Sequence, residues 1–234
     1  IDENGILTLP IEEVKTTNEG SIGTVKVRVV TQNYNDFYVT VNVTAENRIK
    51  PTGKPTLSRE RITYGEPISS IELSGTMHDD VNNVEVTGKF AWKGNTDMVP
   101  DVGSVLSGWR FTPDNSVLYA PVEDDSLFYV DKAKLPEDAI IEAPAAISGL
   151  IYQPDVSTPQ VLHTKGKIKS GVGTMKYTLG DPESADTVWS EEPVASRSAG
   201  EFTVYYKIFG DSNHLDSAYG EIKCGIAKYE IKYD

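Results

Sequence analysis

Side chains able to do acid–base, nucleophilic or metal chemistry are few and scattered in this sequence. The three histidines, His78, His163 and His214, lie far apart, and none has the close spacing to a second ligand that metal sites show. The acidic runs at 78–80 and 123–125 lack the spacing of a calcium loop, so we interpret both as solvated turns. No nucleophile elbow, phosphate-binding loop or dinucleotide fingerprint occurs. We therefore expect no catalytic residue, no metal site, no cofactor and no enzymatic activity.

Two aromatic side chains are the candidates for ligand contact. Trp189 lies in a loop-like stretch, and Tyr205 has the opposite strand parity to Phe202 and Val204, so it faces away from them. Exposed aromatic rings stack on sugar faces, which would make Trp189 and Tyr205 contacts for a glycan or a host protein. The alternative is that both rings pack on linkers or on neighbouring elements of the chain.

The single cysteine, Cys224, excludes an internal disulfide. It lies in the run 220–226, where it alternates with other side chains as a strand residue would. We interpret it as a small buried side chain without special reactivity, because no histidine is near it in the sequence.

The elements that would position these groups are β-strands, because apolar residues recur with a period of two almost everywhere. The clearest alternating runs are 25–30, 37–44 and 202–208, and turn-forming residues lie at 33–36, 93–95, 113–115 and 210–213. The best helix candidate, 131–135, is stopped by Pro136. Regularly spaced strands and turns predict an all-β chain of sandwiches.

Two proline-containing stretches, 49–56 and 131–146, are predicted to be extended linkers. They divide the chain into 1–49, a partial or small β module, and two complete modules at 50–133 and 134–234. The last two segments share an order of motifs: a strand with tyrosine, a strand beginning with glycine, then a long aromatic strand and a turn. The offset is roughly 85–90 residues, which suits an immunoglobulin-like module.

Net charge restricts the partners. The 234 residues carry a formal charge of −13, and such an acidic surface repels phosphate backbones and anionic headgroups, so we expect no nucleic-acid binding. No run approaches the ~18 apolar residues of a membrane span, and residues 1–9 lack the basic start of a signal peptide. We expect a monomer whose export signal and anchor lie outside this segment.

Several motifs carry a resemblance to known repeats. Residues 150–152, 160–162, 173–177, 189–190, 199–207 and 210–214 resemble a repeat of large surface proteins of Gram-positive bacteria. Residues 62–65, 88–92 and 111–119 are similar to the related MBG-type repeat, and 32–44 resemble the closing hairpin of a preceding module. The resemblance implies tandem immunoglobulin-like sandwiches, joined by short proline-containing linkers, on the bacterial cell surface or wall. Gln153 departs from the turn pattern, and 1–49 is short for a complete sandwich.

Three functions are consistent with this sequence. The favoured one is a non-catalytic stalk or spacer, which rests on the repeats, the proline linkers and the scarcity of chemical motifs. The second is an adhesin module that binds a host glycan or protein through Trp189 and Tyr205. The third is an accessory region of a secreted hydrolase. The spacer has the neighbouring repeats of its own chain as its partners. The ligand of an adhesin, the number of repeats and the mode of anchoring do not follow from the sequence.

Overall fold

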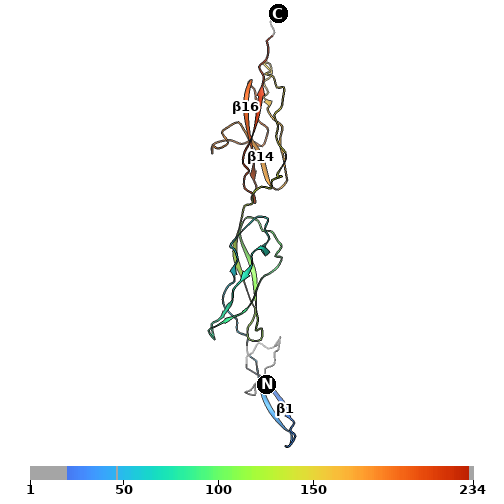
Figure 1. Ribbon diagram of the computed structural model, residues 1–234, viewed down its shortest axis with the longest axis vertical. Coiled ribbons are helices and arrows are strands. Elements are labelled where there is room, and N and C mark those ends of the chain that lie inside the picture. Colours follow the sequence, from blue (N-terminus) through green and yellow to red (C-terminus); the bar gives the residue numbers. More distant parts are fainter. Residues whose placement is uncertain (1–19, 46, 232–234) are drawn as a thin grey trace. The chain divides into compact units, whose positions relative to one another are not determined.

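The computed structural model describes residues 20–45 and 47–231, and within them the chain is built from strands (Figure 1). The described residues contain no α-helix, and their one helical turn is the 3-10 segment η1 (Ile68–Ser70). The predicted all-β class is therefore confirmed. The helix candidate 131–135 is wrong: it is an extended connector in which Ala133 forms a backbone bridge. No described helix is long and apolar enough to cross a membrane.

The described chain divides into two compact units with interleaved sequence. Among the described residues, the first unit comprises 20–45, 47–59, 71–96 and 106–127, and the second comprises 60–70, 97–105 and 128–231. Two long strands, β9 (Gly103–Pro113) and β10 (Val122–Asp131), contribute residues to both units. Each unit has a separate hydrophobic core.

The first unit begins with a hairpin of β1 (Gly20–Val29) and β2 (Phe37–Ala45), joined by the predicted turn at 33–36. Val25 pairs with Val41 and Val29 pairs with Phe37, so the alternating apolar residues share one face. That face stays open, since Val25 is 42% exposed and Phe37 51% exposed. A hairpin of two strands is marginally stable by itself.

The core of the first unit forms where strands cross-pair their aromatic residues. Strand β8 (Gly88–Trp92) pairs with β9 in antiparallel register, with Trp92 opposite Trp109 and Phe90 opposite Phe111. Trp109 and Phe111 are completely buried, and the Phe90 ring meets both of them at centroid distances of 5.4 and 4.7 Å. These large rings fill the interior of the first unit.

The remaining strands of the central part of the chain are short. The four-stranded sheet has the order β4–β10–β9–β8, with β4 (Arg61–Thr63) parallel to β10 at its edge. Two small antiparallel pairs form separate two-stranded sheets: β3 (Thr56–Leu57) with β5 (Leu73–Ser74), and β6 (Met77–Asp79) with β7 (Val84–Val86).

The first proline-containing stretch, predicted as an extended linker, is packed into the first unit. Pro51 and Pro55 are buried, and between them Thr52 exchanges backbone hydrogen bonds of 2.8 and 2.7 Å with His78. Because proline lacks a backbone N–H, it fits beside such an isolated bridge without leaving a donor unpaired. In the second stretch, Pro144 and Ala139 are likewise buried. Burial of these side chains removes the freedom that a linker would have.

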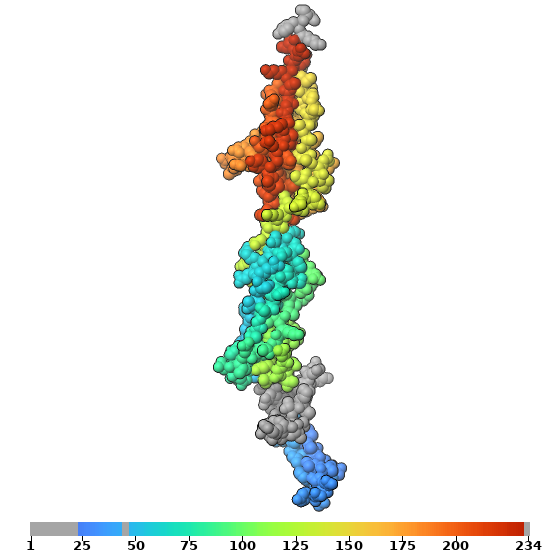
Figure 2. Space-filling view, in the orientation of Figure 1, coloured from blue at the N-terminus to red at the C-terminus, as the bar shows by residue number. Residues whose placement is uncertain are grey.

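The second unit is organised around the antiparallel sheet β14–β16–β17, formed by β14 (Gly173–Thr178), β16 (Gly200–Gly210) and β17 (Gly220–Ile226). Its core contains Tyr177, Val204 and Ile208. Figure 2 shows the loop that follows β14, in orange, standing out from the side of this unit. Two short pairs, β11 (Ile140–Glu142) with β13 (Lys167–Ile168) and β12 (Gln160–Val161) with β15 (Ala195–Ser196), lie outside that sheet.

Candidate functional site

The predicted contact residue Trp189 lies in the loop between β14 and β15 and is half-buried. Its indole ring meets the ring of Phe209 edge-on, with centroids 5.4 Å apart. The ammonium group of Lys207 lies 4.2 Å from the Phe209 centroid and 5.6 Å from that of Trp189, so a cation covers both rings. Trp189 therefore combines with a strand aromatic and a lysine in one cluster on the surface.

The second predicted contact residue, Tyr205, lies on the same face of β16 as Lys207 and Phe209, because alternate strand residues share a face. It is half-buried, and its ring packs perpendicular to that of Tyr219, with centroids 5.6 Å apart. The hydroxyl of Tyr219 donates a 3.3 Å hydrogen bond to Glu183, whose negative charge raises the pKa of that phenol. Trp189 and Tyr205 thus belong to two separate ring pairs, Trp189 with Phe209 and Tyr205 with Tyr219.

The three histidines are held by protein groups in separate places. His163 is completely buried, and its Nε2 accepts a 2.9 Å hydrogen bond from the Val194 N–H. Nδ1 therefore carries the proton and donates it to the carbonyl oxygen of Thr164, 2.9 Å away. Burial lowers the pKa of His163, which favours the neutral ring. Within residues 20–45 and 47–231, no three His, Cys, Asp or Glu side chains gather closely enough to hold a metal ion.

Two further polar groups are buried in the cores. Cys224 is 5% exposed on β17, and burial raises the pKa of its thiol, so the unreactive protonated form is favoured. Asp79 is completely buried and accepts hydrogen bonds from the side chain and backbone N–H of Asn82, the Val81 N–H and the Tyr119 hydroxyl. The Asn82 side chain contributes most to lowering the pKa of Asp79. Asp79 therefore stabilises the turn at residues 79–82, and Cys224 is part of the core of the second unit.

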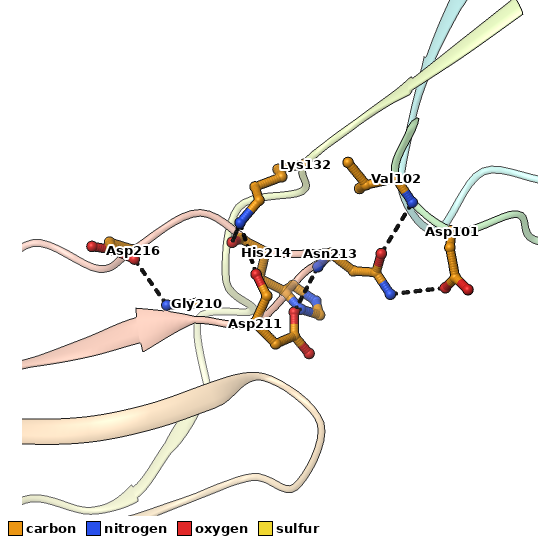
Figure 3. Close-up of polar contacts among 8 residues, drawn as sticks. All are labelled: Asp101, Val102, Lys132, Gly210, Asp211, Asn213, His214 and Asp216. Atoms are coloured by element: carbon orange, nitrogen blue, oxygen red, sulfur yellow. Dashed lines mark hydrogen bonds and ion pairs between the residues drawn. The ribbon is translucent and has the colours of Figure 1, made fainter. Parts of the chain in front are cut away.

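A network of polar contacts in the second unit surrounds the β16–β17 turn, residues 210–216 (Figure 3). The side-chain amide of Asn213 accepts a 3.0 Å hydrogen bond from the Val102 N–H and donates a 2.9 Å bond to Asp101. The Asn213 N–H donates to the carboxylate of Asp211 over 2.9 Å, which holds the turn closed. Asn213 therefore ties the turn to a segment more than 100 residues earlier in the sequence.

The same turn holds the connector that follows β10. Ala133 donates its N–H to the Asn213 carbonyl over 2.9 Å and accepts from the Leu215 N–H over 2.8 Å, a one-residue parallel bridge. The ammonium group of Lys132 donates to the carbonyl oxygens of Asp211 and His214, at 2.7 and 3.2 Å (Figure 3). Backbone and side chain thus both fix the connector.

Charge and ring contacts stabilise the turn itself. The hydrogen bond between His214 and Asp211, 2.8 Å long, is the main cause that lowers the pKa of Asp211. The His214 ring packs edge-on against Tyr64 with centroids 5.3 Å apart. Burial alone would raise the pKa of Asp216, but its contacts with Lys207 and the Gly210 N–H lower it overall. The arrangement holds chain segments together.

Comparison with known proteins gives no assignment. No protein-family model matches the chain, and no curated protein matches it in sequence.

Sequence reasoning identified residues 210–213 as a turn and missed what the turn binds. The signal available was the set of residue types: aspartate and asparagine side chains accept hydrogen bonds from nearby backbone N–H groups, and glycine permits tight turns. An added Cβ at Gly210 would lie 2.3 Å from the His214 carbonyl oxygen, so glycine is required by close approach of the backbone. The partners Lys132, Asp101 and Val102 have no local signal in the sequence.

Proposed function

We propose that this chain is a non-catalytic spacer of β modules whose connectors are fixed by hydrogen bonds, from the extracellular part of a bacterial surface protein. The observation that carries the proposal is the bridge of Ala133 to the β16–β17 turn, reinforced by Lys132. A spacer transmits position along its length, so it needs connectors that do not act as free hinges. The surface location is supported by the resemblance of residues 150–214 to repeats of such proteins.

Limited proteolysis with trypsin tests the fixed connector. Lys132 and Lys134 lie within the connector, and Lys228 lies in an exposed segment after β17. Because a protease needs a locally opened backbone, we expect cleavage after Lys228 to precede cleavage after Lys132 by at least about tenfold in rate. Equal rates at both sites would show that the connector opens freely, and the spacer proposal would then fail. A single compact globule by small-angle scattering would also contradict it.

The second candidate function is adhesion through the face of β16 that carries Tyr205, Lys207 and Phe209. The observation that favours it is the cluster of Trp189, Phe209 and Lys207, which presents rings and a cation on one surface. Sugars stack on such rings. A glycan array probed with the whole chain tests this function, with the Trp189→Ala variant as control. Binding lost in that variant supports adhesion, and a blank array removes it.

A further inference from the structure

Two connector residues of this chain, Ile49 and Ala133, form the same pair of backbone hydrogen bonds with a turn. In the first unit, Ile49 donates its N–H to the Leu118 carbonyl and accepts from the Ala120 N–H, both over 2.9 Å. In the second unit, Ala133 forms the equivalent pair of bonds with Asn213 and Leu215. Both contacts are one-residue parallel bridges to the turn that follows an eleven-residue strand, β9 or β16.

A basic residue precedes each bridging residue and donates a hydrogen bond to a backbone carbonyl at the equivalent position of its turn. Arg48 donates from Nη1 to the Ser116 carbonyl over 3.2 Å, and Lys132 donates from Nζ to the Asp211 carbonyl over 2.7 Å. Ser116 lies three residues before the bridged Tyr119, and Asp211 lies three residues before the bridged His214. A basic residue followed by a bridging residue therefore binds a turn at two places in this chain.

The residues that come directly before Lys132 and before Lys228 also form equivalent parallel bridges. Thr63 bridges Asp131 in parallel, and Tyr64 donates its N–H to the Asp131 carbonyl over 2.8 Å. Ile151 bridges Ala227 in parallel, and Tyr152 donates its N–H to the Ala227 carbonyl over 2.8 Å. Tyr152 therefore occupies the position of Tyr64.

The residues after the two bridges correspond in the same way. Lys132 and Ala133 follow Asp131, and Lys228 and Tyr229 follow Ala227. Lys132 and Ala133 hold the β16–β17 turn, and Tyr64 contacts His214 of that turn. At the second position the equivalent groups are open: Tyr152 is 36% exposed and Tyr229 is 55% exposed. Residues 151–156 and Tyr229 line a shallow open pocket of about 380 Å³ there.

We propose that this surface, formed by residues 151–156 and 227–229, seats the turn after the long strand of a further β module of the same kind. The inference rests on the proposed spacer function and names the partner. The incoming turn must offer a carbonyl to Lys228, a carbonyl and an N–H to the backbone of Tyr229, and a flat side chain to the Tyr152 ring. The β16–β17 turn of this chain, with His214 at its bridge, meets all of these requirements.

An extended chain tests the proposal. Residues 134–231 are repeated directly after Tyr229, so that Tyr229 takes the place of Ala133 in front of the added copy. Hydrogen exchange is then followed by NMR in the extended and the original chain. We expect the Tyr229 amide to exchange at least about tenfold more slowly in the extended chain, because it gains an acceptor. In the extended chain, Lys228→Ala should reduce that protection about fivefold, while Lys223→Ala, on β17, leaves it unchanged.

The outcomes distinguish failure of the proposed docking surface from failure of the spacer function. If the strand amides of the added copy are protected and Tyr229 exchanges as in the original chain, the docking surface is refuted. If Ala133 also exchanges freely, the spacer proposal itself fails. Should the added copy not fold, residues 50–231 appended after Tyr229 provide the second arrangement, in which Tyr229 takes the place of Ile49. An unprotected Tyr229 before a folded copy there likewise refutes the inference.

Discussion

Lys132 donates a 2.7 Å hydrogen bond from its ammonium group to the backbone carbonyl of Asp211, 79 residues further along the chain. The bond fixes a connector that the sequence marks only by its prolines. A side chain that caps a carbonyl in this way restrains two segments at once, because the same ammonium group also reaches the carbonyl of His214.

Replacing Lys132 by methionine keeps the length of the side chain and removes the donor. We expect the Ala133 and Leu215 amides to exchange about fivefold faster, which corresponds to about 1 kcal/mol for a hydrogen bond at the surface. Hydrogen exchange measured by NMR checks this. Lys134→Met, at an exposed position two residues away, is the matched control and should leave both amides unchanged.

The buried neutral His163 predicts a dependence of stability on pH. Its pKa is lowered in the folded chain, so the unfolded chain binds a proton more readily as the pH falls below about 6.5. The stabilising contribution is therefore complete above pH 6.5 and decreases as the pH falls toward the folded pKa, by at most about 1.4 kcal/mol per pH unit.

Urea unfolding between pH 7.5 and 5.5, followed by near-ultraviolet circular dichroism, measures the slope. The ring of Tyr177 packs on the His163 ring with centroids 4.5 Å apart. His163→Gln should remove the slope in this window, although it also lowers stability by disturbing the bond from Val194. His78→Gln serves as control, since the His78 side chain is 46% exposed. A slope that persists in His163→Gln would assign it to another group.

Replacing Gly210 by alanine should lower stability more than replacing Gly225, a glycine of the same sheet. A Cβ at Gly210 would lie 2.3 Å from the His214 carbonyl oxygen and 2.6 Å from that of Leu215, so Gly210→Ala must displace the turn. We expect a loss of roughly 1–3 kcal/mol in the free energy of unfolding. Gly225→Ala should change stability by no more than about 0.5 kcal/mol, because its nearest new contact is 3.7 Å. Denaturant titration of both variants checks the prediction, which equal losses would contradict.

Cys224 predicts a slow reaction with thiol reagents. The side chain is 5% exposed and its pKa is raised by burial, so both access and thiolate formation are disfavoured. We expect labelling of the native chain to be at least about 100-fold slower than labelling in denaturant. A variant that combines Cys224→Ser with Val188→Cys, at a position 85% exposed, should react rapidly when native. Fast native labelling of Cys224 would show that β17 opens readily.

The strand content could be predicted because alternation is a local property of the chain. The predicted runs 25–30, 37–44 and 202–208 carry their period of two wherever they pair, and all of their residues except Val30 lie in strands of the structure. The same local rule predicted that Tyr205 faces away from Val204, which is completely buried while Tyr205 is half-buried. The ligand-contact role of Trp189 and Tyr205 remains a prediction.

What the sequence determined by itself was therefore the all-β class and the positions of most turns, because strand parity and turn chemistry act over a few residues. Only the tertiary structure decided that Pro51 and Pro55 pack into a core, that Lys132 holds Asp211, and that Asn213 bonds to Asp101. These partners lie up to 112 residues apart, and their meeting depends on how whole strands pack, which no local pattern encodes.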